Sequence, residues 1–254
     1  MPLNTIAQTL KSLHKSGQPL VVANVYDALS ARNVASLPSC KALGTASYAI
    51  AVANGTTDDD LELETNLLAV RGIAAVAKEY NKPLTVDIQD GYGARLEEAI
   101  AALIDLGVTG VNLEDYDKAN KKMYSLEVAK KRVERALAVA KNKGVPDFVI
   151  NARCDALVQG GQFDEVLIRG KQYLAAGATT VFVWGGSRGV SRREAEVMVK
   201  EFDGRLNVLM KMEPDGLKIA QLRDIGVARI SVGPQIQTLA MQTFAKEAEM
   251  ILKA

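Results

Sequence analysis

The sequence has little cysteine, almost no net charge and no long apolar run. Cys40 and Cys154 are the only cysteines among 254 residues, too few for a disulfide framework. The formal net charge of +1 gives no sign of a nucleic-acid or membrane-surface partner. No apolar run reaches the roughly 18 residues of a membrane span, and residues 1–5 lack the basic and apolar regions of a secretion signal. We therefore expect a soluble, cytoplasmic protein that binds neither nucleic acid nor membrane.

What the sequence does contain is a regular alternation of short apolar runs, rich in β-branched residues, with longer segments of helical period. It predicts strands over residues 20–25, 42–46, 84–88, 110–113, 148–152, 180–184, 207–210 and 229–232. It predicts helices over residues 62–80, 96–106, 126–143, 163–176, 191–202, 216–225 and 236–253. Eight such units in about 250 residues indicate an α/β fold, a single-domain (β/α)8 TIM barrel spanning residues 1–254. An open doubly wound sheet is the alternative, but no Gly-x-Gly-x-x-Gly turn follows the first strand.

Polar residues gather where these strands end, which is where barrel enzymes carry their active sites. Successive strand residues face opposite ways, so lumen-facing side chains can be separated from those that face the helices. The lumen-facing candidates are Thr45, Ser47, Asp87, Gln89, Asn112, Glu114, Asn151, Arg153, Lys211 and Glu213. The same alternation turns Cys154, Met210 and Met212 toward the helices. Such a mixture of acids, a guanidinium and small hydroxyls suits an anionic substrate bridged by a cation.

The most informative segment covers residues 84–93, with the sequence LTVDIQDGYG. A buried strand delivers Asp87 to the rim, together with Gln89 or Asp90, before glycines allow a sharp turn. Oxygen ligands of this kind suit a hard divalent cation such as Mg²⁺. The segment therefore predicts a metal site at the end of the third strand.

Several motifs, taken in order along nearly the whole chain, resemble the phosphoenolpyruvate mutase/isocitrate lyase superfamily, in particular its short phosphoenolpyruvate mutase-like branch. They are residues 26–32 (YDALSAR), Thr45-Ala46-Ser47 followed by residues 49–51 (AIA), Asp58, residues 87–93 (DIQDGYG), residues 111–115 (VNLED) and residues 151–153 (NAR). Each motif alone is weak, and their joint occurrence at the ends of predicted strands carries the resemblance.

The resemblance implies binding of a small 2-oxo or 2-hydroxy carboxylate, or a phosphonate, on Mg²⁺ or Mn²⁺. It implies that Asp87 holds the metal directly, that Asp58 and Glu114 hold it through waters, and that Gln89 stands in the place of a second acid. The backbone of Ala46, Ser47 and Tyr48 would grip the substrate carboxylate, and Arg153 would pair with an anionic end. Further substrate contacts are expected from Tyr26, Thr45, Lys211 and Glu213. The resemblance also implies a homo-oligomer, a dimer or a tetramer, with the C-terminal helix exchanged between neighbours.

Two departures from the superfamily pattern bear on the chemistry. Gln89 replaces an acid, which removes a negative charge and weakens metal binding. Residues 115–125 contain neither the cysteine nor the histidine of the longer lyases, which argues against isocitrate or methylisocitrate lyase activity. The Asn-Ser pair of the mutases is also not evident. The proton donor would then be Tyr48, Lys118 or Tyr124, with Glu114 and Arg153 as the other catalytic residues.

Three functions follow from these residues. The first is a Mg²⁺-dependent lyase that cleaves a C–C bond in a small 2-oxo or 2-hydroxy acid through an enolate-like intermediate. The second is a phosphonopyruvate hydrolase or phosphoenolpyruvate mutase that acts on a P–C bond. The third is a metabolite-binding barrel that has lost its chemistry, a reading suggested by Gln89.

Structural roles compete with catalytic ones at several positions. Glu114 and Arg153 could simply pair with each other across the barrel mouth. Lys211 could be a Schiff-base nucleophile, although a lone lysine is a weak motif. Cys154 is expected to be a packed core residue and His14, the single histidine, a surface residue. The glycine-rich turn after Trp184, residues 185–189, could bind an anion through its backbone amides or form a flexible rim.

Overall fold

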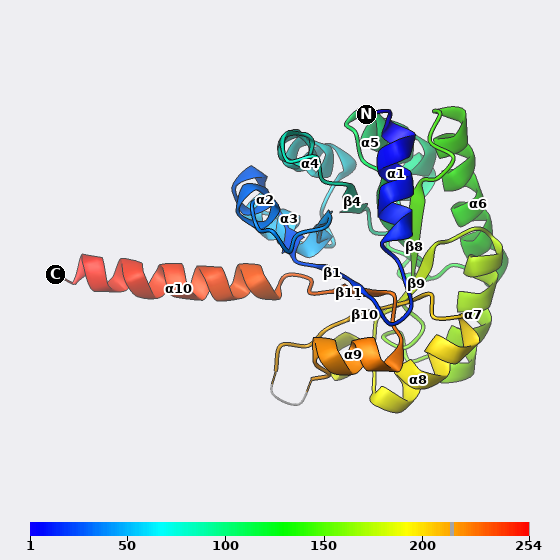
Figure 1. Ribbon diagram of the computed structural model, residues 1–254. Helices are drawn as coiled ribbons and strands as arrows, with labels where there is room; N and C mark the ends of the chain where they lie inside the picture. Colours follow the sequence, from blue (N-terminus) through cyan, green and yellow to red (C-terminus); the bar gives the residue numbers. More distant parts are fainter. Residues whose placement is uncertain (214–215, 254) are drawn as a thin grey trace.

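The computed structural model describes residues 1–213 and 216–253 and forms an α/β barrel (Figure 1). Within these residues, parallel strands follow one another in the order β1-β11-β10-β9-β8-β5-β4-β3-β2. β1 pairs with β11 at one end of this order, and β2 pairs with β3 at the other. β1 and β2 flank Ala23 and are the two halves of the predicted first strand, so the sheet closes on itself. The predicted barrel of eight β–α units is confirmed.

The strands of the barrel are short, between two and six residues. They are β1 (Leu20–Val22), β2 (Asn24–Val25), β3 (Leu43–Thr45), β4 (Leu84–Asp87), β5 (Gly110–Glu114), β8 (Val149–Cys154), β9 (Thr180–Val183), β10 (Leu206–Leu209) and β11 (Arg229–Ser231). A separate antiparallel hairpin, β6 (Tyr116–Asp117) with β7 (Lys122–Met123), follows β5. This hairpin was not predicted.

Helices surround the barrel and connect its strands. They are α1 (Leu3–Ser12), α2 (Ala28–Ala35), α3 (Ser47–Ala53), α4 (Leu63–Glu79), α5 (Leu96–Asp105), α6 (Leu126–Asn142), α7 (Phe163–Ala175), α8 (Arg192–Glu201), α9 (Ile219–Ile225) and α10 (Gln235–Leu252). The face of α4 that carries Val70, Ile73, Ala74 and Ala77 is buried, which is the spacing of one side of a helix. These apolar faces form one continuous core with the outer side of the sheet. Cys154 lies in that core, fully buried, as predicted.

α1 closes the N-terminal end of the barrel. Leu10 packs in a separate buried cluster with residues at the beginnings of three strands, Leu20, Ala42 and Val149. Polar residues of α1 reach the α6–β8 connection, where Asn4, Gln8 and Lys11 bond the carboxylate of Asp147. The active-site end of the barrel therefore lies opposite α1.

The interior of the barrel is unusually polar. Arg229, at the start of β11, is 1% exposed and reaches across to β5, where Nη2 donates to Oδ1 of Asn112 at 3.3 Å. Asn151 donates to the same oxygen at 2.7 Å, and Thr180 donates to Asn151 at 2.6 Å. Nε and Nη1 of Arg229 are buried without a hydrogen-bond partner in the described part of the chain. A positive charge thus lies inside the barrel, below the strand ends, and burial lowers its pKa to about 10.

α10 projects away from the barrel (Figure 1). Its apolar side chains are exposed, among them Phe244 at 69% and Leu252 at 86%. Exposed apolar residues on this scale mark an interaction surface. Across the described residues, no helix combines the length and the apolar character that a bilayer crossing requires.

His14 lies just beyond α1 and is partly buried, so its prediction as a surface residue is wrong. Nδ1 donates to the carbonyl oxygen of Leu10 at 2.9 Å, and Nε2 is buried without a partner among residues 1–213 and 216–253. Burial, aided by the positive charge of Arg229, lowers the pKa of His14 from 6.5 to about 3. Sequence reasoning did not predict this low pKa, because Arg229, whose charge contributes to it, lies far away in the sequence.

This low pKa predicts a loss of stability in acid. The unfolded chain binds a proton at His14 below pH 6.5, whereas the folded chain does not until about pH 3. The free energy of unfolding is therefore unaffected by this group above pH 6.5. It falls as the pH decreases, by about 3 kcal/mol at pH 4.5. Urea unfolding of the wild type and of His14→Leu at pH 7 and pH 4.5 tests this. The difference in the free energy of unfolding between the two proteins should change by this amount between the two pH values. A difference that is constant with pH, or a single histidine NMR signal that titrates near pH 6.5, would contradict the prediction.

Candidate active site

Asp87 ends β4 at the mouth of the barrel and is held from several sides. Its backbone N–H donates to Oγ1 of Thr45 at 2.9 Å, and its Oδ2 accepts the backbone N–H of Ser47 at 3.0 Å. Oδ1 of the same carboxylate is buried and has no hydrogen-bond partner in the described structure. A buried carboxylate oxygen without a partner is costly unless something else satisfies it. Among the described residues of this mouth, Asp87 is therefore the acid whose carboxylate oxygen most clearly needs a further partner.

The turn after Asp87 has an unusual backbone. Gln89 and Tyr92 have φ values of 52° and 59°, in the left-handed region that residues other than glycine rarely adopt. Gly91 has φ 73°, and a Cβ there would clash with the side chain of Leu96. Asn66 of α4 holds the turn by donating to the carbonyl oxygen of Asp87 at 3.0 Å and to the hydroxyl of Tyr92 at 2.6 Å. Strain of this kind persists where the surroundings fix it, and it is concentrated at functional sites.

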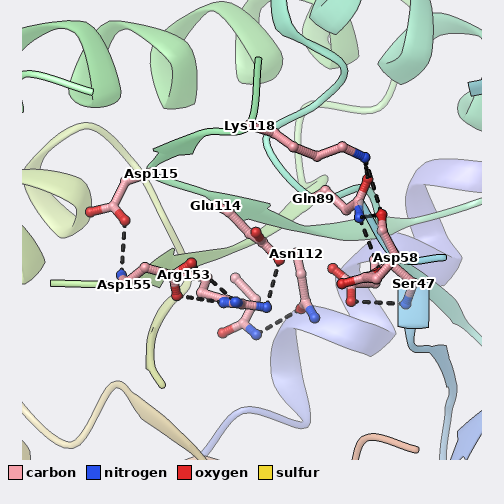
Figure 2. A network of polar contacts seen from close by, with 11 residues as sticks. Ser47, Asp58, Gln89, Asn112, Glu114, Asp115, Lys118, Arg153 and Asp155 are labelled. Atoms are coloured by element: carbon pink, nitrogen blue, oxygen red, sulfur yellow. Dashed lines mark hydrogen bonds and ion pairs between the residues drawn. The ribbon is translucent and has the colours of Figure 1, made fainter. Parts of the chain in front are cut away.

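Gln89 bridges two loops at the mouth (Figure 2). Its Nε2 donates to the carbonyl oxygen of Asp58 at 2.6 Å and to Oδ1 of Asp58 at 3.0 Å. Its Oε1 accepts from Nζ of Lys118 at 2.9 Å. The sequence prediction placed Gln89 and Asp58 at a metal, and the structure brings them together, but with the amide occupied by protein partners.

Arg153 lies between two carboxylates on the other side of the mouth (Figure 2). Its Nη1 is 2.5 Å from Oε1 of Glu114, and its Nε and Nη2 bond both oxygens of Asp155 at 2.6 and 3.0 Å. The guanidinium also stacks on the ring of Trp184, 4.3 Å from its centroid. The structure contains the ion pair between Glu114 and Arg153 that the sequence analysis weighed as the structural alternative to their catalytic roles, and the two carboxylates balance the charge of the arginine.

The acids at this mouth raise one another's pKa. Burial, followed by the negative charge of Asp87, raises the pKa of Asp58. Burial raises the pKa of Glu114 well above its ordinary value, against the opposing effect of Arg153, and Asp155, Asp87 and Asp58 raise it further. Carboxylates that crowd together in this way favour a cation between them.

The β6–β7 hairpin that carries Lys118 is anchored outside the barrel. The hydroxyl of Tyr124 donates to Oδ2 of Asp90 at 2.9 Å, and the guanidinium of Arg132 lies over its ring. At the start of the hairpin, Asp115 accepts from the hydroxyl of Tyr173 at 2.5 Å, and burial raises the pKa of Asp115 to about 6. Tyr124, a candidate proton donor, therefore already donates its proton to a protein carboxylate.

Several predicted site residues lie elsewhere. Nζ of Lys211 donates to the carbonyl oxygen of Ser187, and Glu213 is exposed. β10 ends at Leu209, so strand alternation no longer applies to Lys211, Glu213 or Met212, and the prediction that Met212 packs against the helices is wrong, since it is 42% exposed. This position gives no support to Lys211 as a Schiff-base nucleophile, and burial raises the pKa of the Cys154 thiol, which opposes its reactivity.

The residues expected to grip the substrate lie around β3 and the first turn. Ala46 and Ser47 are buried at the start of α3, and the Ser47 amide already bonds Asp87. Tyr48 is 51% exposed and lines a groove of about 400 Å³ between α3 and α10. Tyr26 packs partly against the core, next to the capping box that Asp27 forms with Ser30. Their substrate contacts remain predictions.

Sequence reasoning did not identify Asp155 and Trp184 as partners of Arg153, and it missed Asn66. Asp155 had a usable signal, because it stands two residues beyond Arg153 and strand alternation gives the two residues the same face. Trp184 comes directly after β9, but an aromatic ring at a strand end more often packs in the core than stacks on an arginine. Asn66 lies in the first turn of α4, where nothing in the sequence distinguishes it from a surface residue.

The described residues offer a metal few direct ligands. No three His, Cys, Asp or Glu side chains within residues 1–213 and 216–253 are grouped so that they could hold one ion. Mg²⁺ usually keeps several of its waters and is bound by only one or two carboxylates. The free Oδ1 of Asp87, with Asp58 and Glu114 as acceptors for bound waters, fits that mode. The oxygen of Gln89 does not, since it faces the Lys118 ammonium.

A barrel with buried acids and an arginine at its mouth defines a class of enzymes that act on small anions, and comparison with known proteins agrees. The family model for phosphoenolpyruvate phosphomutase matches residues 10–252. A solved structure from Burkholderia cenocepacia, provisionally named a phosphonomutase, is 33% identical, with a TM-score of 0.88 over 98% of this chain and 99% of that chain. The phosphoenolpyruvate phosphomutase of Streptomyces viridochromogenes is 27% identical over 81% of this chain and 67% of its own length.

The chain therefore belongs to the phosphoenolpyruvate phosphomutase family, within the phosphoenolpyruvate mutase/isocitrate lyase superfamily, and its homologues are lyases and mutases. The resemblance inferred from the sequence motifs is confirmed. A phosphonopyruvate hydrolase solved with oxalate and Mg²⁺ shares the fold, with a TM-score of 0.85 at 21% identity over 98% of this chain and 87% of that chain.

Proposed function

We propose that the protein is a Mg²⁺-dependent lyase that cleaves a C–C bond in a small 2-oxo or 2-hydroxy dicarboxylate. The observation that carries this proposal is the Asp87 carboxylate, which has one oxygen fixed by the Ser47 amide and the other buried and free. Asp58 and Glu114 stand beside it, and Arg153 lies on the other side of the mouth. This is an arrangement for a cation and a di-anion together.

Each residue has a distinct part in this chemistry. Asp87 would bind the cation, Mg²⁺ or Mn²⁺, and Asp58 and Glu114 would accept hydrogen bonds from its waters. The bound cation would stabilise negative charge on the 2-oxo group. Arg153, held in place by Asp155 and Trp184, offers a planar fork to the far carboxylate, which would compete with Glu114 for it. Lys118 already donates to three protein oxygens, as Tyr124 does to one, so Tyr48 is our candidate proton donor.

Binding of oxalate, which mimics an enolate, tests this function. In isothermal titration the wild type should bind oxalate only when Mg²⁺ or Mn²⁺ is present. Asp87→Asn should weaken that binding by about 100-fold or more, because it removes the charged ligand. Asp59→Asn, an exposed acid next to Asp58, is the matched control and should bind as the wild type does. Metal-independent oxalate binding, or an Asp87→Asn variant with unchanged affinity, would refute the proposal.

A second candidate is cleavage or rearrangement of a P–C bond. It is favoured by residues 115–125, which lack the cysteine and histidine of the longer lyases, and by the match to the phosphomutase family model. It is disfavoured by Arg153, whose charge Glu114 and Asp155 already balance, whereas a phosphonate brings more negative charge than a carboxylate.

Phosphorus NMR separates the two reactions. We expect the signal of phosphonopyruvate to stay unchanged when it is incubated with the Mg²⁺-loaded protein. A new signal of inorganic phosphate would show a hydrolase, and one of phosphoenolpyruvate a mutase. A barrel that only binds metabolites would bind oxalate with Mg²⁺ and turn over neither substrate class.

We also propose that the protein is a homo-oligomer in which α10 packs against another copy. The support is the length of α10 that leaves the barrel with exposed apolar residues, and the groove that its base forms with α3. Burying such residues gains about 25 cal/mol for each Å².

Light scattering after size exclusion tests the assembly. The wild type should elute as a dimer or tetramer, and the pair of changes Phe244→Glu and Ile251→Glu, seven residues apart on one face, should give monomers. Lys246→Glu, on another face of the same helix, should leave the assembly intact. A monomeric wild type would rule this arrangement out.

A further inference from the structure

The hydrogen-bond partners of Gln89 determine which way its side-chain amide is oriented. An ammonium can only donate, and a carboxylate or carbonyl oxygen can only accept. The amide must therefore turn its oxygen to Lys118 and its nitrogen to Asp58, as observed. Gln89 is 4% exposed, so these contacts are shielded from water. Among neutral side chains of this length, an amide is the one that can both accept a hydrogen bond from Lys118 and donate one to Asp58.

The partners of Gln89 belong to two different mouth loops. Asp58 lies in the segment 54–62 between α3 and α4, and Lys118 lies in the β6–β7 hairpin, segment 116–123. Lys118 crosses to the first loop as well, since Nζ donates to the carbonyl oxygens of Asp58 at 3.1 Å and Leu61 at 3.4 Å. Gln89 is the point at which both loops meet the end of β4 (Figure 2).

We propose that Gln89 is a positioning residue that joins these two loops and orients the Asp58 carboxylate, and that it does not ligate the metal. The left-handed backbone of Gln89 supports this role, because the strain is maintained only if contacts on several sides hold the residue. A cation coordinated by Oε1 would lie against the ammonium of Lys118. The inference rests on the proposed function in one respect, that this mouth holds a metal.

The proposal explains why the superfamily's acid is replaced here. A glutamate at position 89 could still accept from Lys118, but it could not donate to Asp58. Its charge would lie about 3 Å from Oδ1 of Asp58, and like charges at that distance repel strongly in a buried site. Gln89 and Lys118 therefore form a matched pair in this chain.

Hydrogen exchange of the metal-free protein, followed by mass spectrometry, tests the proposal. Gln89→Met keeps the volume and removes the hydrogen bonds, so exchange should increase about tenfold or more in segments 54–62 and 116–123 together, with α1 unchanged. Lys118→Met should give the same pattern, and the double variant should exceed neither single one by much. Gln89→Glu should loosen segment 54–62 while it leaves the hairpin protected. Gln235→Met is the matched control, since that amide bonds Met210 and Val232, away from both segments.

Unchanged exchange in both segments of Gln89→Met would overturn the proposal, and so would a Gln89→Glu variant that protects both. Because no metal or substrate is present, these outcomes do not depend on the proposed reaction. A failure of oxalate binding in the wild type would remove the proposed function and leave the exchange result standing. Loss of loop protection with intact oxalate binding would support both.

Discussion

The free oxygen of Asp87 is the constraint around which the rest of the mouth is organised. The carboxylate cannot turn away, because Ser47 holds one oxygen, and Thr45 and Asn66 hold its backbone. An uncompensated buried charge costs several kcal/mol. The surrounding acids increase that cost, and Arg153 and the interior Arg229 reduce it without bonding to the oxygen. This unbalanced charge is the feature on which the proposed cation site rests.

Much of the fold could be predicted from the sequence, because the barrel depends on local pattern. Apolar runs of four to six residues between helical segments are enough to locate the strands. The hairpin at Tyr116 and Lys122 could not be found this way, since its strands are two residues long and the residues on either side of it, Asp115 and Tyr124, are held by tertiary contacts. The low pKa of His14 likewise depends in part on the charge of Arg229, which is more than two hundred residues away in the sequence.

Residues of the candidate site could be predicted where they lie on strands, because the alternation of side chains along a strand shows which of them face the lumen. Glu114 and Arg153 meet because β5 and β8 are neighbours in register, Glu114 beside Arg153. Lys211 and Glu213 follow a strand that has already ended, so alternation carried no information there. The orientation of Gln89 could not be predicted at all, since it depends on partners 31 and 29 residues away in separate loops.

Arg229 also has a consequence for the order of folding. It lies on β11, which closes the barrel by pairing Leu20 with Arg229, and the only hydrogen bond of its side chain in the described structure is to Asn112 on the opposite side. Its guanidinium loses water only when that last strand docks, and neither half of the barrel can shelter it alone. Closure therefore combines a long chain loop with the desolvation of a charge, both of which slow folding. Until β11 docks, the edges of β1 and β10 are unpaired, and unpaired strand edges favour aggregation.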